Sequence, residues 1–254
     1  FPSVGLGWAV SNEKWFEPAS MVINFMKLRA TWGKVGNAKI TGRRFAYLAT
    51  IQNKGSYTFG QNGDQSFSGL EIGEEAVDVS WETAYKWNLG LDINTLSNAL
   101  SLHADVFYDM REGIFLARGD LPWYVGMTNM PLGNLGKVKN KGFEVSAEYK
   151  KQFNDEWFLS LMANCAFNRN EVVDNDVKYA YPWLDVRGQR VGQRYGYIAE
   201  KLFESDEEVA ASAYQSGDTR AGDIKYKDLN GDGKIDQYDK APIGWGSVPE
   251  IMYG

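Results

Sequence analysis

The chain has 254 residues, a net charge of −6, a pI near 5.0 and 44% hydrophobic residues, a composition that excludes a disordered segment. The acidic balance argues against a nucleic-acid-binding protein, because such a protein needs a basic face to displace counterions. One cysteine and one histidine exclude an internal disulfide and any multi-cysteine or multi-histidine metal site within the sequence.

The sequence opens inside a strand-like alternation, in which Val4, Leu6 and Trp8 are separated by small residues. It shows no signal peptide, and we therefore expect a piece of a longer chain. No run of about 18 apolar residues predicts a transmembrane helix. No nucleophile elbow or phosphate-binding loop is present either, so we expect no catalytic residues and no enzyme.

The two-residue period is most complete in residues 81–93, WETAYKWNLGLDI, where odd positions are Trp, Thr, Tyr, Leu or Ile and even positions are polar or small. Because successive side chains of a strand point to opposite faces, one face of this strand is apolar over its whole length. The strand is also long compared with the roughly 5–6 residues typical of globular proteins. Other predicted strands are 4–10, 26–34, 100–111, 141–150 and 157–169, with one more starting near 249.

Residues 81–93 and 100–111 predict an antiparallel hairpin with Ile93 opposite Leu100. That register places Glu82 opposite Arg111 on the polar face, as a cross-strand pair of opposite charge.

The connections between predicted strands differ sharply in length. The short ones are 94–99 and 151–156, the medium one is 11–25, and the long ones are 35–80, 112–138 and 170–249. Short turns at one end, long loops at the other and strands of this length are typical of outer-membrane barrels. We predict an all-β fold, an antiparallel transmembrane β-barrel segment of about six complete strands with long extracellular loops, as part of one barrel domain. A soluble β-sandwich or propeller is the alternative, because its strands also alternate.

The long loops predict little regular structure. Their one predicted helix lies in ESDEEVAASAY, where Ser205 and Glu208 have the spacing of a capping box.

An acidic loop at 228–239, DLNGDGKIDQYD, has the ligand spacing of an EF-hand-type calcium loop, with Gly233 at the sharp turn. The expected ligands of a structural Ca²⁺ ion are Asp228, Asn230, Asp232, the carbonyl of Lys234, Asp236 and Asp239. No amphipathic helix flanks the loop, so we do not expect a calcium sensor. A turn held by Asx hydrogen bonds is the alternative.

Candidate substrate contacts are aromatic residues of the long loops, whose rings could stack on sugars, and the one histidine. They are Trp123, Tyr124, Trp183, Tyr195, Tyr197 and His103. The alternative for each aromatic residue is packing within its loop, and for His103 it is a place in the wall of the pore.

Seven segments resemble, in order, the C-terminal half of SusC/RagA-type TonB-dependent transporters, and together they cover nearly the whole chain. They are FPSVGLGWAVS, LRATWGKVGN, WETAYKWNLGLDI, LSLHADVFYDM, NLGKVKNKGFEVS, GYIAEKLFES and GDIKYKDLNGDGKID.

The resemblance implies a barrel of about 22 strands, plugged by an N-terminal domain, in the outer membrane of a Gram-negative, Bacteroidetes-like cell. It implies contact with outer-membrane lipid, a SusD-like surface lipoprotein as partner, and energy supplied through TonB. The imported substrate would be an oligosaccharide or, as a second class, a peptide. We expect the plug domain, the TonB box and the final strands outside this sequence. A soluble calcium-dependent β-rich carbohydrate-binding or adhesin module is the alternative from another class.

Overall fold

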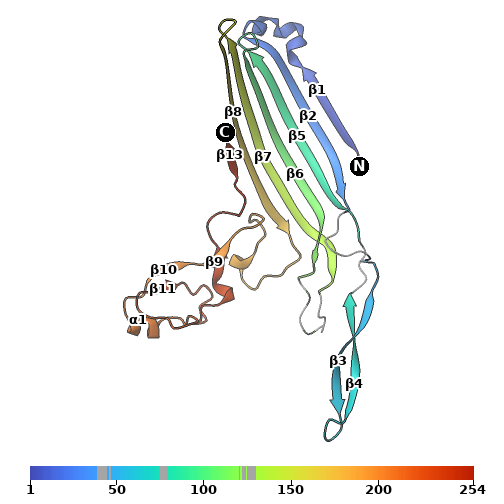
Figure 1. Ribbon diagram of the computed structural model, residues 1–254, viewed down its shortest axis with the longest axis vertical. Helices are drawn as coiled ribbons and strands as arrows, with labels where there is room; N and C mark the ends of the chain where they lie inside the picture. The colour runs from blue at the N-terminus through green and yellow to red at the C-terminus, as the bar shows by residue number, and fades with distance from the viewer. Residues whose placement is uncertain (39–44, 46, 75–78, 120, 122–123, 125–129) are drawn as a thin grey trace.

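The computed structural model describes residues 1–38, 45, 47–74, 79–119, 121, 124 and 130–254. Their main feature is one antiparallel sheet whose strands lie side by side in chain order (Figure 1). The strands are β1 (Ser3–Ala9), β2 (Ile23–Asn37), β5 (Glu82–Thr95), β6 (Leu100–Ala117), β7 (Leu132–Gln152), β8 (Phe158–Asp174) and β13 (Ile251–Tyr253). All the predicted strands are therefore confirmed, including the one near 249.

The pairing of the strands keeps the apolar positions on one side of the sheet. One row of directly opposed residues is apolar across every strand: Leu6, Ala30, Leu89, Val106, Phe143, Phe167 and Ile251. The neighbouring row lies on the other side and contains Arg29, Asp105 and Glu144. Because a slip of one residue would exchange the two sides, these registers determine which side carries charge.

The predicted register of the hairpin 81–93/100–111 is wrong by two residues. Ile93 lies opposite Leu102, and Arg111 lies opposite Ala84. The turn is centred on Ser97 and Asn98, which have φ of 58° and 67° and lack the glycine that usually marks such a turn. A shift of two residues leaves every side chain on its predicted side. Arg111 still reaches Glu82 diagonally, with 3.2 Å between Nη1 and Oε1.

Strands β6, β7 and β8 are longer than predicted. The 21 residues of β7 span about 70 Å, well beyond the roughly 30 Å of a bilayer hydrocarbon core. On the apolar side of β7 and β8 the alternation ends at Lys141, which lies opposite Arg169, and the next pair on this side is Lys139 with Glu171, at 2.6 Å. Strand pairing continues past this point without an apolar face. The sequence pattern therefore underestimates the length of these strands and overestimates the length of the loop 112–138.

The expectation of little regular structure in the long loops is wrong. A separate hairpin, β3 (Thr50–Phe59) and β4 (Gln65–Glu74), projects far beyond the sheet (Figure 1). The last long connection forms a folded lobe. Its elements are η4 (Pro182–Leu184), β9 (Tyr195–Tyr197), β10 (Ala199–Leu202), α1 (Asp206–Ala211), β11 (Ile224–Tyr226), η5 (Gln237–Asp239) and β12 (Lys240–Pro242). Within the lobe β10 pairs with β11, and β9 pairs with β12.

The medium connection folds into two 3-10 helices, η1 (Val10–Asn12) and η2 (Lys14–Met21). They lie at the same end of the sheet as the short turns 96–99 and 153–157 (Figure 1).

The main sheet is a single layer without a core of its own. The buried apolar side chains of the described residues are Val10, Phe16, Phe203 and Ala241, all outside the main sheet. On its apolar side Leu6 is 75% exposed and Leu89 64% exposed. A soluble sandwich would cover this side with a second sheet. In the part of the chain that the structure describes, no helix is both long and apolar enough to cross a membrane.

Candidate functional site

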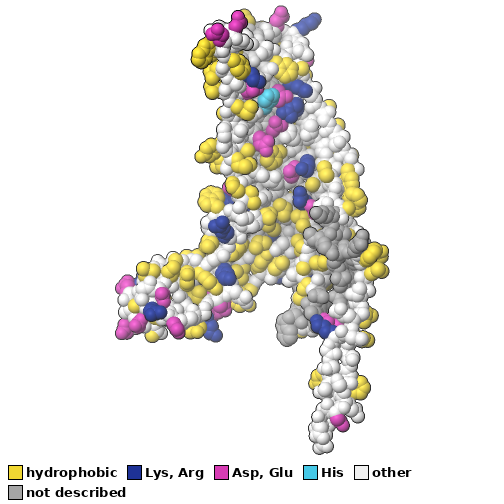
Figure 2. Space-filling model, in the orientation of Figure 1, with side chains coloured by type: hydrophobic (Ala, Val, Ile, Leu, Met, Phe, Trp, Pro, Cys, Tyr) yellow, Lys and Arg dark blue, Asp and Glu magenta, His cyan; other side chains and the backbone are white. Residues whose placement is uncertain are grey.

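The polar side of the sheet carries a charged cluster centred on Arg29. Its guanidinium donates to Asp92 on β5, with 2.9 Å from Nε to Oδ2, and to Asp105 on β6, with 3.0 Å from Nη2 to Oδ2. His103 Nδ1 lies 2.9 Å from Oδ1 of Asp92. The cluster therefore ties three strands together, and one nitrogen of His103 is engaged with the wall itself. Figure 2 shows acidic and basic side chains along this part of the sheet.

Gly90 lies between Arg29 and Asp105 in the row of directly opposed residues. A Cβ on Gly90 would lie 2.6 Å from Arg29 Cζ and 2.7 Å from Asp105 Oδ1. The glycine therefore provides the space in which the guanidinium lies across the strands.

Uncharged amides and hydroxyls accompany the charges on this side. They are Asn88, Asn94, Ser101, Ser146, Asn164 and Asn168. A groove of about 330 Å³ runs beside His103 and is lined by Asp105, Glu144 and neighbouring residues of β7 and β8. Glu144 lies opposite Asp105, which already accepts from Arg29. This side of the sheet is a polar wall that offers both donors and acceptors to a solute.

The predicted calcium loop at 228–239 lies in the lobe between β11 and β12. Asp228 accepts two backbone N–H groups of the loop, at 2.7 and 2.9 Å. Asp239 is 0% exposed and accepts two more, at 2.8 and 2.9 Å. Gly233 has a φ of 81°, which confirms its place at the sharp turn.

The donor set of this loop consists only of oxygen atoms, which suits a hard cation such as Ca²⁺. In the structure Asn230, Asp232 and Asp236 also accept backbone N–H groups two residues ahead, at 2.8 to 3.1 Å. Across the described residues, no group of three or more His, Cys, Asp or Glu side chains is arranged to hold a metal ion. The hydrogen bonds satisfy the Asx-turn alternative, and calcium at this loop stays a prediction.

Trp183 packs within the lobe. Its ring stacks on Tyr181 with 4.7 Å between centroids and 10° between planes, and its Nε1 donates to the carbonyl of Tyr238 at 2.7 Å. Tyr238 belongs to the acidic loop, so Trp183 joins that loop to η4. One face of the indole is therefore covered by Tyr181 of the same lobe, as the packing alternative requires.

The other predicted aromatic residues lie in separate places. Tyr195 donates its hydroxyl to the carbonyl of Asp185 at 3.1 Å, and burial raises the pKa of its phenol. Tyr197 packs 5.3 Å from the ring of Tyr226. Tyr124 is largely exposed on the connection between β6 and β7, and Trp123 lies outside the described residues. Trp183, Tyr195 and Tyr197 share the lobe, whereas His103 lies on the wall, so the described candidates do not form one site.

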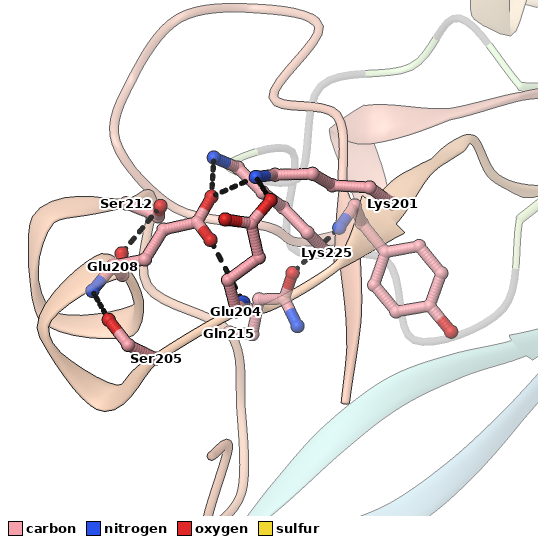
Figure 3. A network of polar contacts seen from close by, with 8 residues as sticks. Lys201, Glu204, Ser205, Glu208, Ser212, Gln215 and Lys225 are labelled. Atoms are coloured by element: carbon pink, nitrogen blue, oxygen red, sulfur yellow. Dashed lines mark hydrogen bonds and ion pairs between the residues drawn. The ribbon is translucent and has the colours of Figure 1, made fainter. Parts of the chain in front are cut away.

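Glu208 of α1 lies within a network of polar contacts in the lobe (Figure 3). Ser205 Oγ accepts the Glu208 N–H at 3.2 Å, which confirms the predicted cap of α1. The Glu208 carboxylate accepts the Glu204 N–H at 3.0 Å, one residue before the position expected in a capping box, and the Lys225 ammonium at 3.0 Å. The hydrogen bond from the Glu204 backbone N–H, followed by the one from the Lys225 side chain, lowers the pKa of Glu208 to about 2.

Sequence reasoning missed the contacts that attach the lobe to the sheet. Arg190 donates to Glu250, just before β13, and its guanidinium lies 4.8 Å above the ring of Trp245. Val191 N–H donates to Asn170 of β8 at 2.8 Å. These residues are far apart in the sequence and form no motif, so only their position in the fold reveals them.

Comparison with known proteins agrees with this architecture. The family model "TonB dependent receptor-like, beta-barrel" matches residues 1–241. TonB-dependent receptor P3 of Formosa agariphila is 28% identical over 100% of the chain and 26% of its own length, and SusC of Bacteroides thetaiotaomicron is 26% identical over 94% and 24%. The RagAB peptide transporter has the same fold, with a TM-score of 0.68 and 20% identity over 99% of this chain and 26% of that one.

The chain thus spans about a quarter of the length of these relatives, or 26% for P3. Its open sheet, with one apolar and one polar side, fits a segment of a lipid-embedded barrel wall. The chain belongs to the TonB-dependent receptor-like β-barrel family of the bacterial outer membrane.

Proposed function

We propose that the chain is part of a transporter that imports an oligomeric nutrient across the outer membrane, together with a SusD-like lipoprotein and with energy supplied through TonB. The observation that carries this proposal is the family match over residues 1–241. The matched sheet has one apolar side, which suits lipid, and one polar side, which offers hydrogen bonds. Strands outside this chain would close the barrel, because open sheet edges are not stable in lipid.

We infer that the cargo is a glycan. The wall presents amides and hydroxyls such as Asn88, Ser146 and Asn164, while Arg29 is already engaged by Asp92 and Asp105. A wall of this kind offers hydrogen bonds to an uncharged, hydroxyl-rich chain, whereas a peptide brings charged termini that need unpaired partners. The RagAB relative is a peptide transporter, so peptides are the class to test against.

The test is uptake by cells that carry the whole protein and its partner, measured with labelled oligosaccharides and labelled oligopeptides. We expect saturable oligosaccharide uptake that stops when a protonophore removes the proton gradient. Uptake of peptides but not of oligosaccharides would reject the glycan as cargo, while the proposal of a transporter would stand. Uptake that is insensitive to both the protonophore and loss of TonB would reject energised transport.

We also propose that the loop at 228–239 binds Ca²⁺ through Asp228, Asn230, Asp232, Lys234, Asp236 and Asp239, and that the ion orders the lobe where the lipoprotein would rest. Several carboxylates in one short loop repel each other unless a cation is bound or hydrogen bonds compensate. The structure shows the hydrogen-bonded arrangement, in which Asp228 and Asp239 each accept two N–H groups.

Terbium luminescence tests this site, because Tb³⁺ takes calcium-type ligands and the aromatic side chain of Tyr238 lies within the loop. We expect sensitised Tb³⁺ emission that decreases when Ca²⁺ displaces the Tb³⁺ ion. The Asp232→Ala variant should lose this emission while its barrel stays folded. Asp218→Ala, an exposed acidic residue of the same lobe, is the matched control. Equal emission from wild type and Asp232→Ala would leave only the hydrogen-bonded turn.

A further inference from the structure

The 3-10 helix η2, Lys14–Met21, has three chemically distinct sides. A 3-10 helix has three residues per turn, so residues three apart lie above one another. The inner side carries Phe16, which is buried, and Ala19. The polar side carries Lys14, Glu17 and Ser20, all exposed, and the outer apolar side carries Trp15, Pro18 and Met21.

The outer apolar side is strongly exposed, with Trp15 63% and Met21 87% accessible. Three apolar side chains in line on a short helix form one continuous apolar surface. Such a surface usually marks a contact with a partner or a membrane, whereas single exposed apolar residues do not.

This apolar side continues the lipid-facing surface of the sheet. The ring of Trp15 lies 6.2 Å from that of Trp8, which stands opposite Leu28 on the apolar side. Trp8 Nε1 also donates to Oε1 of Glu13, the residue that precedes η2, at 2.9 Å. The helix is therefore attached to the lipid-facing surface at its edge, at the end of the sheet with short turns (Figure 1).

We propose that η2 is a membrane-interface anchor that lies in the plane of the periplasmic leaflet, with Trp15, Pro18 and Met21 in the phospholipid headgroup–acyl boundary. The end with short turns faces the periplasm in barrels of this kind. Tryptophan favours this boundary because its ring is amphipathic, and the polar side of η2 can stay in water. The occupant is a phospholipid monolayer, since the surface is continuous with the lipid-facing side and not with the polar wall.

Site-specific photo-crosslinking tests this proposal in the whole protein, reconstituted in vesicles of phosphatidylethanolamine and phosphatidylglycerol with an alkyne-tagged acyl chain. Benzoylphenylalanine is placed singly at Trp15 or Met21 on the apolar side, and at Glu17 or Ser20 on the polar side. We expect several-fold more tagged-lipid adduct from the first pair than from the second. Leu89 and Asn88 calibrate full lipid contact and its absence, and only variants with the gel mobility of the folded barrel are compared.

Equal lipid adducts at Trp15 and Glu17, or adducts at the level of Asn88 for both Trp15 and Met21, would overturn the anchor. In native envelopes, adducts of Trp15 with protein rather than lipid would show that the surface binds a periplasmic protein instead, and would also reject the proposal. Having two reporters on each side keeps the comparison decisive if one substitution prevents folding.

Discussion

Arg29 can bridge β2, β5 and β6 only because Gly90 leaves room beneath it. We expect Gly90→Ala to destabilise the barrel by about 1–3 kcal/mol, since the new methyl group would force the guanidinium away from Asp105. A Cβ on Gly90 would lie 2.6 Å from Arg29 Cζ, which is too close for both atoms to stay in place. Urea unfolding of the protein in vesicles measures the effect.

Gly5→Ala is the control for this substitution. Gly5 lies on the same side of the sheet, but its Cβ would make only ordinary contacts, 3.4 Å from Thr31 Cγ2 and 4.0 Å from the Ala30 carbonyl oxygen. If both alanines cost the same free energy, the effect belongs to strand glycines in general and not to the charged cluster.

Glu208 makes the lobe sensitive to acid. The folded lobe lowers the pKa of this carboxyl from 4.5 to about 2, so the ionised form is favoured by folding. Its contribution to stability is therefore complete above pH 4.5 and is lost as the pH falls through about 2. We expect the α1 amides to lose hydrogen-exchange protection over this range, after correction for intrinsic rates.

Glu208→Gln should remove most of that pH dependence and lower protection at neutral pH, because it removes the charge that pairs with Lys201 and Lys225. Glu200→Gln, at an exposed position on β10, should change neither. An unchanged pH profile in Glu208→Gln would assign the acid sensitivity to another carboxyl group.

At the scale of elements, the apolar side of β5 and β6 predicts how the folding free energy changes when a charged residue is introduced. Leu89→Arg and Ala104→Arg should each cost about 2–4 kcal/mol of folding free energy in vesicles, because both place a cation on the lipid side. Asn88→Arg places the same residue on the polar side, one position from Leu89, and should be far milder. Equal costs for all three variants would contradict the assignment of the two sides.

Turn chemistry decides the register of this same hairpin. Ser97 and Asn98 adopt the positive φ of a two-residue turn, although neither is glycine. The alternating pattern alone is compatible with registers that differ by two residues, since each keeps every side chain on the same side. The sides of Glu82 and Arg111 were therefore predictable, whereas their exact partners were not.

At the scale of the molecule, the lobe is attached to the sheet by contacts that include Arg190 with Glu250 and Val191 with Asn170. We expect Arg190→Met to loosen this attachment, because Arg190 has a charged hydrogen bond to Glu250 and lies over Trp245. Thermolysin should then cut the lobe faster, while the folded barrel persists.

Arg187→Met is the matched control, since Arg187 forms its ion pair with Asp185, two residues away within the lobe. Similar cleavage rates for both variants would show that the local loop structure, and not the contact with β13, limits the opening of the lobe.

The sequence alone determined the strands of the main sheet, the side of the sheet on which their residues lie and the family resemblance, because a period of two residues and ordered segments can be read locally. Tertiary structure alone decided the register, the length of β7 beyond the apolar band, the Arg29 cluster over Gly90 and the attachment of the lobe by Arg190. It also showed that Trp183 packs against Tyr181. These features depend on partners distant in the chain, whose pairing follows from turn geometry and close packing and leaves no local pattern in the sequence.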